Sequence, residues 1–227
     1  MKRITLYLLL VLGINTTAFA QKDAEAKVIL NQVSAKYKAY NIVKSDFTFV
    51  IDNPQAQETQ TQEGTIIVQS KTNKYKLSLY SQDPTAKNQV EQEIITDGKN
   101  QWTYTKKDKE VQLNKVDNTD QNFNPAQIFT MYEKGYKYIY TGSETLKGRV
   151  YQIIDLTPED IDKSFFKIRL MIDKTKKQIY SALIFDKSGN KYSYTIKTFV
   201  PNVQVPESTF TFDTKAHPGV EVVDLRQ

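Results

Sequence analysis

The sequence predicts a mainly β fold in which a large, curved antiparallel sheet is covered by helices. From Ser45 onward, apolar and polar residues alternate with a period of two, as in strands that have two unlike faces. Short turns containing Gly, Asn and Asp separate these segments, so consecutive strands are expected to pair as antiparallel hairpins rather than as βαβ units. An amphipathic helix precedes the first strand.

The strand candidates follow one another closely. The longer ones span residues 45–51, 64–70, 73–80, 92–97, 100–105, 110–115, 136–145, 149–156, 165–172, 178–186 and 190–199. A shorter pair is expected at 208–213 and 219–224, and the polar stretches 52–62, 81–91 and 157–164 are expected to be loops.

Two helices are expected. In the first, from Asp23 to Tyr40, apolar residues recur at spacings of three and four and form one stripe. The second is short and spans Asn124 to Tyr132, with Asn124 as N-cap and Pro125 in the first turn. Apolar residues surround most of this second helix, which suggests that it covers part of the sheet.

The first twenty residues have the organisation of a signal peptide. Two basic residues precede an apolar run from Ile4 to Leu12, which is too short to span a membrane. Ala18-Phe19-Ala20 supplies a small-x-small cleavage pattern, so cleavage is expected before Gln21. Residues 1–20 are therefore interpreted as a signal peptide and residues 21–227 as a single exported domain.

Composition excludes several classes of protein. The 227 residues include no cysteine, which excludes disulfides, thiolate metal sites, a cysteine nucleophile and a lipid anchor on cysteine. The single histidine, His217, excludes a multi-histidine metal site, and no G-x-S-x-G motif marks a nucleophile for it. The acidic loop 155–162 lacks the ligand spacing of a calcium loop. We therefore expect neither an enzyme nor a metal, and no cofactor.

Charge indicates no partner. Basic residues are spread singly or in pairs instead of forming a stripe with stacking aromatics, so nucleic acid is not expected to bind. Aromatic residues are the stronger signal: Tyr192, Tyr194 and Ile196 share one face of the segment 190–199. Such residues can line a ligand cavity inside a curved sheet, or pack on the helices as ordinary core. Periodicity leaves both interpretations open.

Five motifs occur in a characteristic order. They are Ser45-Asp46-Phe47-Thr48-Phe49, Glu63-Gly64-Thr65-Ile66-Ile67-Val68, the hairpin 95–104 (ITDGKNQWTY), Phe210-Thr211-Phe212-Asp213 and the ending 218–224 (PGVEVVD). After a signal peptide and an amphipathic helix, this order resembles the LolA family of periplasmic outer-membrane lipoprotein carriers. The resemblance extends over essentially all of residues 21–227.

The resemblance implies a fold and a function. The fold is a strongly curved, incompletely closed antiparallel β-barrel of about eleven strands with an α-helical lid. The implied protein is a periplasmic chaperone, expected to be a monomer, that shields lipoprotein acyl chains in a hydrophobic cavity. It would take triacylated lipoproteins from an inner-membrane ABC transporter and deliver them to an outer-membrane lipoprotein acceptor. The alternative is a carrier or sensor of another hydrophobic ligand, such as a glycolipid, a pigment or a stress-signalling lipid.

The candidate cavity residues are apolar side chains of the strands and of the second helix, and ordinary core packing is the alternative for each. They are Phe47, Phe49, Ile66, Leu77, Leu79, Trp102, Tyr104, Ile128 and Met131. Family members commonly carry an Arg-Pro pair after the strand that follows the E-G motif, and this Arg ties the lid to the barrel. Here the corresponding stretch is 69–73, without Pro, so Lys71 is the candidate lid contact, or else a surface charge beside a turn.

Overall fold

The computed structural model describes residues 17–116 and 128–226. One helix, α1 (Thr17–Lys38), precedes the sheet. The first strands are β1 (Ile42–Asn53), β2 (Glu58–Gln69), β3 (Lys74–Tyr80), β4 (Val90–Asp97), β5 (Asn100–Thr105) and β6 (Glu110–Lys115). The later strands are β7 (Tyr136–Leu146), β8 (Arg149–Pro158), β9 (Phe165–Asp173), β10 (Gln178–Asp186), β11 (Lys191–Ile196), β12 (Val200–Pro201) and β13 (Glu221–Asp224). Short 3-10 turns are η1 (Pro84–Ala86), η3 (Met131–Glu133), η4 (Glu207–Phe210) and η5 (Thr214–Ala216).

All of these strands belong to one 13-stranded sheet. Its order is β13-β6-β5-β4-β3-β2-β1-β11-β10-β9-β8-β7, and β12 pairs with β1. β1 to β6 and β7 to β11 each form a run of antiparallel neighbours, and the β1–β11 ladder joins the two runs. Among the described strands, β7 and β13 end this order without pairing to each other. The sheet is therefore not closed by hydrogen bonds, as the sequence predicts.

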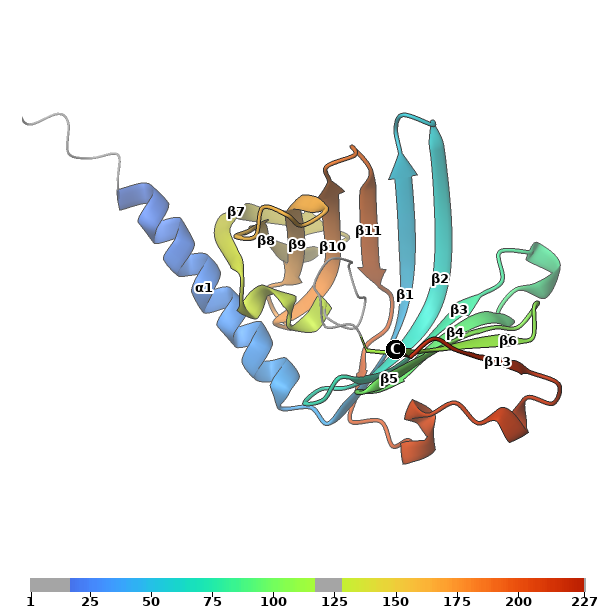
Figure 1. Ribbon diagram of the computed structural model, residues 1–227. Helices are drawn as coiled ribbons and strands as arrows, with labels where there is room; N and C mark the ends of the chain where they lie inside the picture. The colour runs from blue at the N-terminus through green and yellow to red at the C-terminus, as the bar shows by residue number, and fades with distance from the viewer. Residues whose placement is uncertain (1–16, 117–127, 227) are drawn as a thin grey trace, which may run out of the picture.

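The sheet is large and strongly twisted. In Figure 1 the β1–β2 hairpin stands in the centre, with β11 to β7 on the side of α1 and β3 to β6 with β13 on the other side. The strands turn from upright at β1 to nearly level at β6, because twist accumulates between neighbouring strands. The predicted mainly β fold with a large curved sheet is confirmed; of the two expected helices, α1 is present as an α-helix among the described residues.

Aspartates fix several hairpin turns. Asp97 accepts the backbone N–H groups of Lys99 and Asn100 at 2.8 and 2.7 Å in the β4–β5 turn. Asp186 accepts the N–H of Asn190 at 2.7 Å in the β10–β11 turn. Gly98 in the first of these turns has φ +92°, a conformation that favours glycine. These contacts explain why the DGKN and DKSGN sequences predict hairpins correctly.

The polar stretch 52–62 is not the loop that the sequence predicts. It contains the end of β1 and the start of β2, which form a long hairpin around the turn at residues 54–57. The ladder continues to the pair Asn53 and Glu58. Most of the Gln and Thr side chains of this part of β2 are exposed, so the strand lacks the apolar alternation on which the prediction depends.

The C-terminal part also differs from expectation. Segment 208–213 is not a strand, because most of it belongs to or follows the 3-10 turn η4, which Pro206 precedes. The Pro206 carbonyl accepts a hydrogen bond from the Thr209 N–H at 3.0 Å. β13 runs parallel to β6, so the sheet is not antiparallel throughout. β11 ends at Ile196, since the N–H groups of Lys197 and Thr198 bond to the Asp46 carbonyl of β1 at 2.8 and 3.3 Å.

The helices differ in extent from those that the sequence predicts. α1 begins at Thr17 and ends at Lys38, which is earlier at both ends than the expected Asp23 and Tyr40. Residues 124–127 of the second expected helix lie outside the described residues, and its described part forms 3-10 turns up to Glu133 instead of an α-helix.

Candidate functional site: the inner face of the sheet

Strand register collects apolar side chains on one face of the sheet, here named the inner face. Residues directly opposite each other in a ladder point to the same side. Phe49 lies opposite Tyr194, Tyr194 opposite Ala182, and Ala182 opposite Leu170. On the other side of β1, the corresponding row runs through Ile66, Leu77 and Ile94. One apolar surface thus extends from β4 across β1 to β9, and through Ile154 and Leu156 to β8.

Gly64 makes room for the first predicted cavity residue. It lies opposite Phe47 in the β1–β2 ladder. A Cβ at position 64 would come within 2.8 Å of the Phe47 ring and 2.5 Å of the Ser78 carbonyl. The ring therefore lies over the glycine, and its other neighbour is the Tyr194 ring, with centroids 4.7 Å apart. The E-G motif thus has a packing function.

Helix α1 covers part of the inner face. Its buried residues belong to the same cluster as the strand residues: Ala26, Ile29, Leu30, Val33 and Tyr37. The helix lies mainly against β7 and also contacts β10 and η3. Tyr37 stacks on Phe129 with ring centroids 4.7 Å apart and an interplanar angle of 13°. α1 and the segment 128–133 together form what we name the cover.

Glu133 ties the two parts of the cover to each other. Its carboxylate accepts hydrogen bonds from the Ser34 hydroxyl at 2.5 Å and from the Lys38 ammonium at 2.7 Å. Burial opposes ionisation of Glu133, but the hydrogen bonds from Lys38 and Ser34 outweigh it and lower its pKa. These donors lie about a hundred residues away in the chain, so sequence reasoning had no signal for the contact.

Where the cover ends, apolar side chains on the inner face are only half-buried. We name this set the rim: Phe49, Leu79, Ile94, Tyr138, Tyr140 and Tyr192. Phe49 and Tyr192 are stacked, with centroids 6.1 Å apart and an interplanar angle of 7°. A pocket of about 400 Å³ straddles the edge strand β7: Asp23 of α1, Tyr136 and Tyr138 line it together with the outer-face residues Lys137, Ile139, Asp155 and Thr157. Its volume falls within the roughly 300–1,000 Å³ of small-molecule sites.

Trp102 and Tyr104 point to the opposite face, here named the outer face. In the β4–β5 ladder, Trp102 lies opposite Ile95 and Tyr104 lies opposite Glu93. Ile95 and Glu93 flank the inner-face residue Ile94 along β4, so their side chains point to the other face. Tyr104 packs in a three-ring group with Phe212 and His217, with centroids 4.5 to 5.2 Å apart. The C-terminal segment thus covers this part of the outer face.

The structure therefore separates the predicted cavity residues. It brings seven of them together in or against the inner-face cluster: Phe47, Phe49, Ile66, Leu77, Leu79, Ile128 and Met131. Whether any of them contacts a ligand stays a prediction.

The remaining predicted positions lie away from the inner face. Lys71 is exposed in the turn between β2 and β3, and its side chain makes no hydrogen bond or ion pair with another described residue. The predicted cleavage positions Ala18, Ala20 and Gln21 fall in the first turns of α1. Lid contact by Lys71 and cleavage before Gln21 both stay predictions.

Burial keeps three tyrosines of the inner-face cluster neutral. Burial raises the pKa of Tyr37 to about 12 and also raises the pKa values of Tyr132 and Tyr194, so all three rings stay neutral near pH 7. His217 is on the outer face, where its Nδ1 lies 2.9 Å from the Asp213 carbonyl oxygen. Within residues 17–116 and 128–226, His, Asp and Glu form no group of three that could hold a metal ion.

The fold and the inner face define a structural class: a mainly β protein with a curved, incompletely closed sheet and an apolar face beneath a helix. The family described as "Outer membrane lipoprotein carrier protein LolA" matches residues 38–213. The chain therefore belongs to the LolA family, whose members are periplasmic carriers or binders. In the described part of the chain, no helix is both long and apolar enough to cross a membrane.

Solved structures resemble this chain at low sequence identity. An uncharacterized conserved protein from Thermus thermophilus shares the fold; it is 10% identical with a TM-score of 0.58, over 88% of this chain and 99% of that one. A LolA superfamily protein from Nitrosomonas europaea is 13% identical with a TM-score of 0.46, over 83% and 98% of the two chains. LprF from Mycobacterium bovis is 13% identical with a TM-score of 0.47, over 81% and 96%. A comparison with curated protein sequences found no match.

Proposed function

We propose that this protein is a periplasmic chaperone that shields the acyl chains of lipoproteins and carries them from the inner to the outer membrane. The observation that supports the proposal best is the rim. Its side chains continue an apolar surface beyond the cover, and Phe49, Leu79 and Tyr192 remain half-buried there. An acyl chain on this surface would complete the burial of these side chains.

The energetics of acyl chains explain why such a surface is needed. Each buried CH₂ contributes roughly 0.8 kcal/mol, so free acyl chains do not cross water at a useful rate. Release requires that binding be reversible. Methionine side chains suit this requirement, because they repack without a fixed geometry, and Met131 of the cover is partly buried against the inner-face cluster.

Displacement of the cover would expose more of the apolar surface to cargo. It is held by apolar packing, by the Tyr37–Phe129 stack and by the contacts of Glu133 with Ser34 and Lys38. Exposed ion pairs contribute at most about 1 kcal/mol, so the polar part of this attachment can be exchanged for contacts with cargo. We propose that acyl chains displace part of the cover and occupy the inner face next to the rim.

The proposal is tested by release of lipoproteins. Purified protein is incubated with spheroplasts, and triacylated lipoproteins are measured in the supernatant. We expect a soluble one-to-one complex with the wild type and little release by the double variant Phe49→Gln/Leu79→Gln. Phe166→Gln is the matched control, since Phe166 is 51% exposed and packs on Phe185, away from the rim.

Each result has a defined meaning. Release by Phe49→Gln/Leu79→Gln at the wild-type level contradicts the role of the rim. Failure of the wild type to release any lipoprotein, together with binding of a non-protein lipid, favours a carrier or sensor of another hydrophobic ligand. Energy dependence of release checks the proposed donor, an inner-membrane ABC transporter, and transfer to outer-membrane vesicles checks the proposed acceptor.

Export is part of the same proposal. We expect the protein in the periplasmic fraction to begin at Gln21, because signal peptidase requires the small residues Ala18 and Ala20. N-terminal sequencing of the periplasmic fraction measures this directly. Material that begins at Met1 contradicts it. Cleavage at this position removes the first residues of α1 and leaves its buried stripe, which begins at Ala26, intact.

A further inference from the structure

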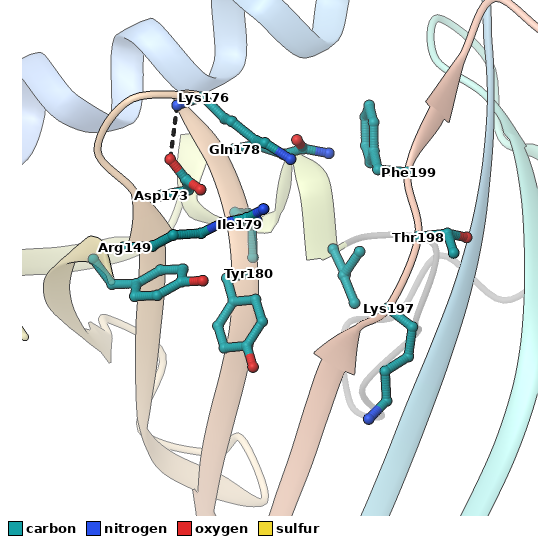
Figure 2. A pocket seen from close by; sticks show the side chains of 11 residues that line it. Arg149, Asp173, Lys176, Gln178, Ile179, Tyr180, Lys197, Thr198 and Phe199 are labelled. Carbon is teal, nitrogen blue, oxygen red and sulfur yellow. Dashed lines mark hydrogen bonds between the residues drawn. The ribbon is translucent and has the colours of Figure 1, made fainter. Parts of the chain in front are cut away.

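A pocket opens where β11 separates from β10. The ladder between these strands ends at the pair Ser181 and Thr195, so the start of β10 has no ladder partner on β11. Beyond Ile196 the chain bonds to Asp46 of β1 instead. The gap forms a pocket of about 130 Å³, which Figure 2 shows between β10 and the segment 197–199. We name it the side opening.

The side opening reaches the inner-face cluster. Ile179 and Ile196 line it and belong to the inner-face cluster, and Phe199 packs against that cluster. Its other lining residues are polar or aromatic: Arg149, Tyr151, Asp173, Lys176, Gln178, Tyr180, Lys197 and Thr198. An apolar wall thus meets a polar wall within one pocket, which is the pattern that an amphiphile requires.

The polar wall is positively charged. Arg149, Lys176 and Lys197 all line the opening, and none of their side chains makes a hydrogen bond or ion pair with a described residue. The single carboxylate, Asp173, accepts the backbone N–H groups of Thr175 and Lys176 at 3.0 and 2.8 Å. The Asp173 carboxylate is therefore already hydrogen-bonded within the turn that follows β9. The dashed line in Figure 2 marks its bond with Lys176.

A further positive charge lies next to the side opening. The Lys36 ammonium of α1 donates a hydrogen bond to the backbone carbonyl of Lys176. The cover therefore adds a cation to the three that line the pocket. Four cations with one satisfied carboxylate favour an anion over a neutral group.

Size decides which part of a ligand fits. Pockets for whole small molecules measure roughly 300–1,000 Å³. The side opening holds about 130 Å³, or a few water molecules at roughly 30 Å³ each. This space suits a phosphate or carboxylate group and excludes a complete amphiphile, so the rest of the ligand must lie elsewhere.

We propose that the side opening binds the anionic headgroup, a phosphate or a carboxylate, of an amphiphile whose alkyl chain lies on the inner face beside Phe199. This inference rests on the proposed binding of acyl chains. The planar guanidinium of Arg149 pairs two of its N–H groups with the anion, and Lys176, whose side chain extends toward Arg149 in Figure 2, adds a charge-assisted hydrogen bond.

The test compares two probes with one alkyl chain, dodecyl phosphate and dodecyl maltoside, with inorganic phosphate alone as a third arm. Affinities are measured calorimetrically below the critical micelle concentrations. The variant is Arg149→Gln/Lys176→Gln, which leaves the backbone bond from Lys176 to Asp173 in place. Its matched control, Lys106→Gln/Lys107→Gln, removes two charges from the exposed β5–β6 turn. We expect the variant to bind dodecyl phosphate at least about tenfold more weakly, with dodecyl maltoside binding unchanged and the control like the wild type.

Other results overturn the inference in distinguishable ways. Equal affinity of the wild type for both alkyl probes overturns the anion site and leaves acyl-chain binding intact. Inorganic phosphate binding as tightly as dodecyl phosphate overturns the lipid headgroup as the source of the anion. Failure of every alkyl probe to bind the wild type overturns the proposed function itself, whatever the variants do.

Discussion

Two aromatic clusters lie on opposite faces of the same sheet and differ in what covers them. On the outer face, Tyr104 packs with Phe212 and His217 of the C-terminal segment, whose strand β13 is hydrogen-bonded to β6. On the inner face, Phe49 and Tyr192 belong to a rim that the cover leaves half-buried. The outer cluster is closed by the backbone of its own chain.

The way in which each cluster is covered distinguishes aromatic residues that only pack from those that are available to a ligand. The C-terminal segment is tied down by a ladder of backbone hydrogen bonds, so its aromatic side chains act as core. The cover is tied by side chains, among them Glu133, Ser34 and Lys38, and it leaves apolar surface at its margin. An abundance of aromatic residues therefore says less about ligand binding than does the way in which each cluster is covered.

Phe210→Ala tests the C-terminal segment that covers the outer face, since Phe210 ends η4, which packs on β3 and β4, and it should have the largest effect. The side chain is 1% exposed, so we expect a loss of about 3–5 kcal/mol in the free energy of unfolding, measured by urea denaturation. Binding of an alkyl probe to the remaining folded protein should not change. Phe49→Ala should show the reverse, with a smaller loss of stability and weaker probe binding. Weak binding by folded Phe210→Ala protein would contradict the separation of the two clusters.

Gly64→Ala tests the packing beneath the inner face. The added Cβ would crowd the Phe47 ring and the Ser78 carbonyl, so we expect a loss of about 1–3 kcal/mol in the free energy of unfolding. Phe47→Leu in the same chain should recover part of this loss, because it removes the ring contact but not the backbone contact. A double-mutant cycle measures the coupling, and additive effects of the two substitutions would speak against the proposed contact.

Glu133→Gln tests the attachment of the cover. We expect faster amide hydrogen exchange in α1, with a change of at most about 1 kcal/mol in global stability. The pKa of Glu133 is lowered from 4.5, so its contribution is fully present above that pH and is lost as the pH falls through the lower native value. Wild-type exchange in α1, corrected for intrinsic rates, should therefore increase in acid, whereas the variant should respond less. Equal pH responses would rule out this role.

Lys71→Ala should have the smallest effect. The side chain is exposed and has no polar partner among the described residues, so we expect a change within about 0.5 kcal/mol and less effect on α1 exchange than Glu133→Gln. The resemblance to carriers with an Arg at the corresponding place predicts the opposite order. Measuring exchange in both variants decides which residue holds the cover.

Most of the strands could be predicted because their alternation and turns are local. β5 and β6 have the predicted bounds, and β10 also does. The exposed part of β2 could not be predicted, because polar side chains on both faces give no alternation. The predicted cavity residues divide between the two faces for a similar reason: Trp102 and Leu77 each alternate with polar neighbours, and alternation alone does not say which set faces the cover.

The sequence by itself determined the mainly β class, the hairpin order and the family, because turn chemistry and period-two patterning act over a few residues. Tertiary structure decided which aromatic residues share a face, which are closed by the chain's own C-terminus, and that Glu133 contacts Ser34 and Lys38 of α1. It also placed Arg149 and Lys176, which come from different strands and turns, at one opening. These relations depend on register and twist between distant strands, which no local pattern encodes.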